Sequence, residues 1–133
     1  MNRAAEEASK DASQILLKSI KNMNINNALS ILNGEENSAT KYLYEKNHED
    51  FKIKFKPIIE KSISNNKVAT NWTKIMTTYN KIPLTEDINP NINDYILEKT
   101  IDGIFVLIAQ EEKKIRENPE NRISKLLQKV FNF

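Results

Sequence analysis

Apolar residues recur every three or four positions along most of the chain, and this spacing predicts α-helices. It predicts a helix over 3–22, a short helix over 24–33 and an amphipathic helix over 68–79. Gly34 follows the second of these, where a left-handed C-terminal cap is common. A long loop over 81–92 follows the third.

The longest pattern covers about 94–117, and its middle, residues 101–109, is apolar nearly all round, which is typical of a buried helix. Asn118 and Pro119 then predict the start of a last helix. Its apolar stripe would consist of Ile123, Leu126, Leu127, Val130 and Phe131. The pattern therefore predicts an all-α fold, a single-domain irregular bundle of about six or seven helices around a buried central helix.

The middle of the chain is ambiguous between helix and strand. A short helix is expected over about 38–44, and Asn47 is expected to cap the next one. Residues 51–56 alternate between apolar residues and lysine, which is the period of a strand. Every fourth residue is also apolar, as in a helix: Phe51, Phe55, Ile59 and Ile63. We favour a helix that Pro57 either kinks or divides.

Composition excludes several classes of protein. The chain has 133 residues, of which 39% are hydrophobic, enough for one domain with its own core. It has no cysteine and one histidine, which excludes disulfides, thiolate sites, histidine-based zinc sites and a Ser-His-Asp triad. No cofactor motif is found. The longest apolar run, Ile104 to Ala109, is six residues, whereas a membrane span needs about 20.

Charge gives little indication of a partner. The net charge is +2, so no nucleic-acid partner is expected. The excess of lysine is concentrated in residues 41–74, which hold eight lysines and four acids. Residues 111–117 are highly charged, and the four-residue spacing of Glu112 and Arg116 predicts an ion pair on a solvated helix end.

Three carboxylates, Asp94, Glu98 and Asp102, are spaced four residues apart on one side of the long helix. Paired carboxylates separated by about 5–10 Å can carry the acid–base chemistry of a hydrolase. Asp102 borders the apolar middle of the helix, where a charge must be paired. We therefore expect it to form a buried structural pair with Lys99 or Arg122, or to accept a hydrogen bond from the indole of Trp72, rather than to act as a catalytic acid.

The loop before the long helix has the spacing of an EF-hand calcium loop at its first, third, fifth, seventh and twelfth positions. The matching residues are Asp87, Asn89, Asn91, Asn93 and Glu98. The position that requires glycine is Ile92, and Pro90 stands at the fourth position. Asn and Asp are also the usual residues of a loop that caps a helix.

Several motifs run through the whole chain: residues 1–6, 28–34 and 55–59; Trp72 with 79–83; Asn89-Pro90 leading to Asp94-Tyr95; and 102–131. Together they resemble an uncharacterised bacterial family, domain of unknown function 4197. The resemblance implies an envelope protein, periplasmic or lipid-anchored, with an export signal and a further N-terminal region before Met1. The lack of an N-cap before the first helix agrees with a fragment. The family supplies no activity, cofactor or catalytic residue, and this chain has Asn91 and Asn93 where members tend to have Asp.

The sequence therefore favours a non-enzymatic helical interaction or ligand-binding domain of the cell envelope. Its partner would be a protein or a small molecule, and its oligomeric state is not indicated. The expected contact surfaces are a groove beside Trp72 and Tyr79 and a polar face, the latter formed by Asp94, Asp102, Arg116 and Arg122. The alternatives are a hydrolase using Asp94, Glu98 and Asp102, and a calcium-binding module at residues 87–98.

Overall fold

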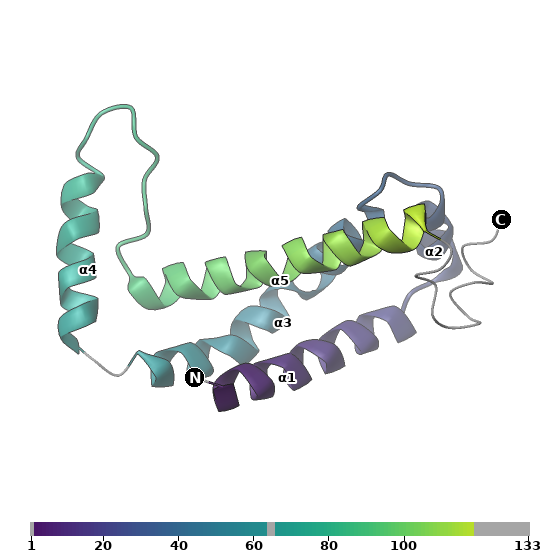
Figure 1. Cartoon of the computed structure of the whole chain (residues 1–133), viewed down its shortest axis with the longest axis horizontal. Coiled ribbons are helices and arrows are strands. Elements are labelled where there is room, and N and C mark those ends of the chain that lie inside the picture. Colours follow the sequence, from purple (N-terminus) through teal and green to yellow (C-terminus); the bar gives the residue numbers. More distant parts are fainter. Residues whose placement is uncertain (1, 64–65, 119–133) are drawn as a thin grey trace. The chain divides into compact units, whose positions relative to one another are not determined.

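The computed structural model describes residues 2–63 and 66–118, which form five α-helices and no β-strand (Figure 1). The helices are α1 (Asn2–Lys21), α2 (Ile25–Leu32), α3 (Ser38–Ser62), α4 (Asn66–Tyr79) and α5 (Ile92–Glu117). The predicted all-α fold is confirmed. Among these helices, none combines the length and apolar composition that crossing a membrane requires. The predicted last helix, from Pro119 to Phe131, lies outside the described residues.

The chain divides into two compact units. Among the described residues, unit 1 comprises 2–15, 49–63 and 66–102, and unit 2 comprises 16–48 and 103–118. Helix α4 belongs to unit 1 and α2 to unit 2, whereas α1, α3 and α5 contribute residues to both.

The core of unit 1 is built from the predicted four-residue ladder of α3. Phe51, Phe55 and Ile59 are buried, and the first two rings meet edge to face with centroids 5.2 Å apart. Helix α5 contributes Leu97 and Ile101 to the same core, again four residues apart and therefore on one side of their helix. The helical interpretation of residues 51–56 is thus confirmed.

Helix α3 is continuous, so the prediction that Asn47 caps a separate helix is wrong. Asn47 is buried in unit 2, where its amide donates to the Leu43 carbonyl at 2.7 Å and its side-chain oxygen accepts from the Ser19 hydroxyl. Pro57 lies inside the helix on its exposed side. Solvent can there satisfy the Ile53 carbonyl, which proline leaves without a helical donor.

Helix α5 is buried on one side only, so the prediction of a fully enclosed central helix is wrong for the described residues. Ile101 and Phe105 are buried, but Val106 and Leu107 are 55% and 62% exposed. Apolar residues all round a helix predict burial only if other elements surround it. The described helices leave one face of α5 uncovered.

Gly34 has a structural role that differs from the predicted left-handed cap. Neither glycine has a positive φ, and Asn33, at the C-terminal cap of α2, is right-handed. A Cβ on Gly34 would lie 2.8 Å from the Ser30 carbonyl oxygen and would collide with the Ser38 hydroxyl. Glycine is therefore needed for space where the chain passes from α2 to α3.

The two glycines give opposite predictions for substitution by alanine. Gly34→Ala is expected to lower the free energy of unfolding by about 1–3 kcal/mol, because the Ser30 backbone cannot easily move. Gly103→Ala is its matched control: a Cβ there meets no atom within 4 Å, and alanine in a helix interior is favoured by about 0.5–1 kcal/mol. Urea unfolding followed by circular dichroism measures both. Equal effects of the two substitutions would contradict this account.

Candidate functional site

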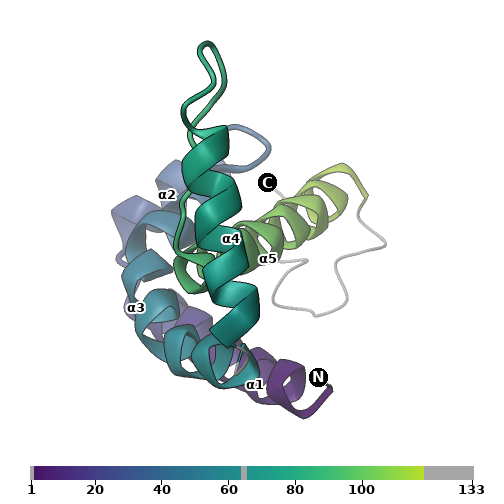
Figure 2. The same cartoon turned by 90° about the vertical axis from the view of Figure 1, so that its left-hand side faces the viewer.

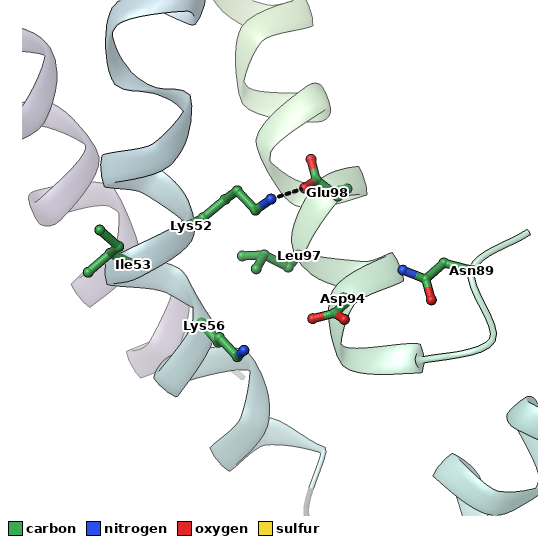
Figure 3. Close-up of a pocket in the computed structure, with 7 residues that line it drawn as sticks. All are labelled: Lys52, Ile53, Lys56, Asn89, Asp94, Leu97 and Glu98. Atoms are coloured by element: carbon green, nitrogen blue, oxygen red, sulfur yellow. Dashed lines mark ion pairs between the residues drawn. The ribbon is translucent and has the colours of Figure 1, made fainter.

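Unit 1 contains a pocket of about 380 Å³ between the middle of α3 and the first turns of α5 (Figure 3). This volume is within the range of small-molecule sites. Its lining combines two lysines, two carboxylates, one amide and two aliphatic side chains: Lys52, Lys56, Asp94, Glu98, Asn89, Ile53 and Leu97.

The lining residues of α3 follow from the register of its buried ladder. Phe51 and Phe55 face the core, so Lys52 and Lys56, each one position further on, lie together at the edge of the buried face, four residues apart. Leu97 is buried at the floor of the pocket. The pocket thus has an apolar floor and a charged rim.

The start of α5 is set by Asn91. Its side-chain oxygen accepts hydrogen bonds from the backbone N–H groups of Asn93 at 3.0 Å and Asp94 at 3.2 Å, as an N-cap does. The Asp94 carboxylate therefore lies in the first turn, where the helix dipole favours a negative charge. Glu98 follows one turn later and lines the same pocket.

The four charges of the rim are unevenly paired. The Lys52 ammonium lies 2.9 Å from a Glu98 carboxylate oxygen, and this hydrogen bond and the charge of Glu98 raise the pKa of Lys52. Lys56 and Asp94 form no ion pair within residues 2–63 and 66–118, although both line the pocket. The rim therefore presents one ammonium and one carboxylate that remain available to a ligand.

Of the three predicted carboxylates, the structure brings two together. Asp94 and Glu98 share the pocket, but Asp102 does not line it and is exposed. The prediction that Asp102 is buried is therefore wrong, because the side of α5 that carries it lacks a covering helix among the described residues. Its proposed partner Arg122 lies outside those residues. The hydrolase alternative stays a prediction, with Glu98 held in an ion pair.

Trp72 supports the pocket rather than filling a core. Its indole N–H donates to the Asn89 carbonyl at 3.0 Å, and its ring lies 4.9 Å from that of Tyr95. The indole is thus hydrogen-bonded to the loop and not to Asp102. Trp72 and Tyr79 are both half-buried on α4. The expected contact groove beside these two residues stays a prediction.

Two of the three asparagines of the predicted calcium loop, Asn89 and Asn91, hold backbone groups, whereas the buried Asn93 Oδ1 accepts no hydrogen bond from a described residue. The Asn89 side chain accepts from the Asn91 N–H at 2.9 Å, and that of Asn91 caps α5. Glu98 is directed to Lys52. Within the described chain there is also no group of three or more Asp, Glu or His side chains arranged to hold a metal.

Arg116, predicted to belong to a contact surface, lies in a buried network of unit 2. Its guanidinium donates to a Glu112 carboxylate oxygen through Nε at 3.0 Å and Nη2 at 2.8 Å. Nη2 also donates to the Ile31 carbonyl, in the last turn of α2, at 2.8 Å. The predicted pair is present, but Glu112 is only 7% exposed, so the expectation of a solvated helix end is wrong for this pair, although its neighbours Lys113 and Glu117 are exposed. The last member of the predicted surface, Arg122, lies outside the described residues.

Glu112 in turn caps the start of α3. Its carboxylate accepts from the backbone N–H groups of Ala39 at 2.9 Å and Thr40 at 2.8 Å, and from the Thr40 hydroxyl at 2.6 Å. Burial acts to raise the pKa of Glu112, but the hydrogen bonds from Thr40, Ala39 and Arg116 outweigh it. The pKa therefore lies below its ordinary value of 4.5.

Unit 2 also has an apolar cavity of about 420 Å³ beside the exposed face of α5. Its lining is mostly aliphatic, with two glutamates at the edge: Ile20, Ala39, Leu107, Ile108, Ile115, Glu111 and Glu112. It offers few groups that could orient a polar ligand, unlike the pocket of unit 1.

The sequence pattern did not single out Lys52 or Lys56 as site residues, and it proposed Asn89 only as part of the calcium loop. The available signal was the alternation of apolar residues and lysine over 51–56, which places two lysines one turn apart beside a buried ladder. Their convergence with the start of α5 depends on tertiary packing and is not encoded in local spacing.

Comparison with known families agrees with the motifs. A family model described as "Protein of unknown function (DUF4197)" matches residues 1–132. The chain belongs to this family. The resemblance drawn from the sequence motifs is therefore confirmed, although the family description names no activity. Neither a curated protein nor a solved structure matches the chain.

The Glu112 network gives a prediction for pH dependence. Because the pKa of Glu112 is lower in the folded chain, its contribution to stability is fully present above 4.5 and is lost as the pH falls through the folded value. Glu112→Gln should lower the free energy of unfolding at neutral pH by about 2 kcal/mol. As the pH is lowered below about 5, the free energy of unfolding of the variant should also fall less than that of the wild type.

The matched control is Glu111→Gln. Glu111 pairs with Lys114 at 2.6 Å on the exposed side of the same helix turn, so its replacement should change stability by less than about 1 kcal/mol. Urea unfolding at a series of pH values measures all three proteins. A parallel pH profile for the wild type and Glu112→Gln would contradict the assignment.

Proposed function

We propose that this chain is a helical ligand-binding domain, and that the pocket of unit 1 binds a small zwitterion with an apolar part. One observation carries the proposal: Lys56 and Asp94 line a pocket of about 380 Å³ and form no ion pair within the described part of the chain. An unpaired ammonium and an unpaired carboxylate complement a ligand that carries both charges.

Each group of the pocket has a role in this proposal. Lys56 donates to the anionic group of the ligand, and Asp94 accepts from its cationic group. Leu97 and Ile53 contact the apolar part. The Lys52–Glu98 pair stays intact and fixes α3 to α5 at the rim, so the two ligand-binding charges keep their spacing.

Titration with L-leucine, followed by calorimetry, tests the proposal. Isocaproate, which lacks the amino group, and isoamylamine, which lacks the carboxylate, should bind at least about tenfold more weakly, since each loses one charge-assisted hydrogen bond. Lys56→Gln and Asp94→Asn should each weaken the binding of L-leucine by a similar factor.

Lys54→Gln is the control for charge. Lys54 is exposed on the same helix and does not line the pocket, so its replacement removes the same charge without touching the site. Absence of L-leucine binding, or an equal loss in Lys54→Gln and Lys56→Gln, would overturn the proposal.

We also propose that the domain works in the bacterial cell envelope, on the basis of the resemblance of its motifs to the family. Expression of the complete gene with a C-terminal tag, followed by cell fractionation, tests this location. The tagged protein is expected in the periplasmic or membrane fraction. Its retention with a cytoplasmic marker enzyme would contradict the proposal.

A further inference from the structure

Helix α4 has two dissimilar sides. The side that packs within unit 1 consists of the half-buried residues Ala69, Trp72, Met76 and Tyr79. The exposed side includes two pairs of neighbours seven residues apart, Lys67-Val68 and Lys74-Ile75. Seven residues are about two helical turns, so the lysines form one row and the aliphatic residues an adjacent row. Figure 2 views α4 and the loop that follows it.

The exposed side of α4 differs from an ordinary solvated surface because it carries aliphatic side chains and no acidic residue. Val68 and Ile75 are 47% and 59% exposed, although the amphipathic pattern of residues 68–79 predicts that both are buried. The helix contains no acidic residue. The lysine–aliphatic pair occurs a third time directly after the helix, at Lys81-Ile82, where Ile82 is 51% exposed.

The loop after α4 extends this apolar surface and is held in shape. The Asn80 side chain donates to the Ile88 carbonyl at 2.7 Å and accepts from the Ile88 N–H at 2.9 Å, which closes the base of the loop. The Thr85 hydroxyl donates to the Ile82 carbonyl at 2.9 Å. The loop therefore has a defined conformation rather than a free one.

Leu84, at the turn of this loop, has a strained backbone and a side chain that no other described residue buries. Its φ is 69°, in the left-handed region that costs a bulky residue about 1–2 kcal/mol, and its side chain is fully exposed. Burial within the chain gives no compensation for this strain. A contact between the Leu84 side chain and a partner outside the chain would explain why this strained conformation is kept.

We propose that the exposed side of α4 and the adjoining turn dock on an anionic lipid bilayer. An apolar row beside a lysine row is the arrangement of helices that lie in a membrane interface. The aliphatic residues enter the acyl boundary, and each lysine near an anionic surface contributes about 1 kcal/mol. The surface uses none of the residues of the pocket, so the inference goes beyond the proposed function.

Charge favours a lipid surface over an acidic protein or a nucleic acid. The row of lysines is short, and Glu86 and Asp87 follow the turn, so electrostatic attraction alone is weak. Binding must combine lysine with exposed aliphatic side chains, which a bilayer interface accepts without a shaped pocket. The interaction is therefore expected to weaken with salt but not to vanish.

Flotation with lipid vesicles tests the inference. The protein is expected to float with vesicles of phosphatidylcholine mixed with phosphatidylglycerol, and less with phosphatidylcholine alone. Lys74→Gln/Ile75→Ser should associate about tenfold more weakly. Leu84→Gly should weaken association by about two- to fivefold, and it keeps the fold because glycine adopts a positive φ without strain.

The matched control is Leu17→Ser/Lys18→Gln. These neighbours lie on α1, Leu17 is 53% exposed and Lys18 is also exposed, so the double change removes the same kinds of side chain elsewhere. Its association should equal that of the wild type. Absence of flotation, an unchanged level in Lys74→Gln/Ile75→Ser, or an equal loss in the control would overturn the inference. Titration of Lys74→Gln/Ile75→Ser with L-leucine keeps the two proposals apart, because that binding should be unchanged.

Discussion

The arrangement of unit 2 depends on two charged side chains of α5 that satisfy the ends of two other helices. Glu112 accepts from the free N–H groups at the start of α3, and Arg116 donates to a carbonyl in the last turn of α2. Each charge has the sign that the helix dipole favours at that end. The two also pair with each other, so neither is buried alone. Unpaired backbone groups at a helix end cost free energy when buried, and here one ion pair removes that cost at both ends.

Periodicity predicted most of the fold because it records which residues must leave water together. The ladder of Phe51, Phe55 and Ile59 defined a helix even though the lysines between them gave the period of a strand. Local signals failed where a residue type has two uses. Asn47 is a good cap in isolation, but a buried helix interior also accepts an asparagine whose amide and carbonyl are both paired. Gly34 likewise suits a left-handed turn, whereas the structure uses it for lack of a Cβ.

The candidate site was less predictable because its residues come from segments that are remote in sequence. Asp94 and Glu98 were recognisable as carboxylates on one side of a helix, but nothing local placed Lys56 opposite them. Asp102 shows that local spacing also fails to predict which residues of a helix are exposed. An apolar run behind a carboxylate implies burial only where a neighbouring element covers it, and the pattern on one helix cannot say which of its sides is covered. The burial of Glu112 was not predicted for the same reason, since a charged helix end is usually solvated.

Helix α4 links the two proposed surfaces without belonging to the pocket. Its packed side fixes the following loop: the Trp72 indole donates to the Asn89 carbonyl, and the Thr73 hydroxyl donates to the Pro90 carbonyl at 2.9 Å. That loop supplies Asn89 to the pocket and leads into the cap of α5, so the packed side of α4 helps to determine where Asp94 lies. The lysine–aliphatic pairs at 67–68 and 74–75 lie on its more exposed side, the pair at 81–82 follows the helix, and none of their residues lines the pocket. One helix can therefore position the ligand site with one side and carry the proposed bilayer-docking residues on the other.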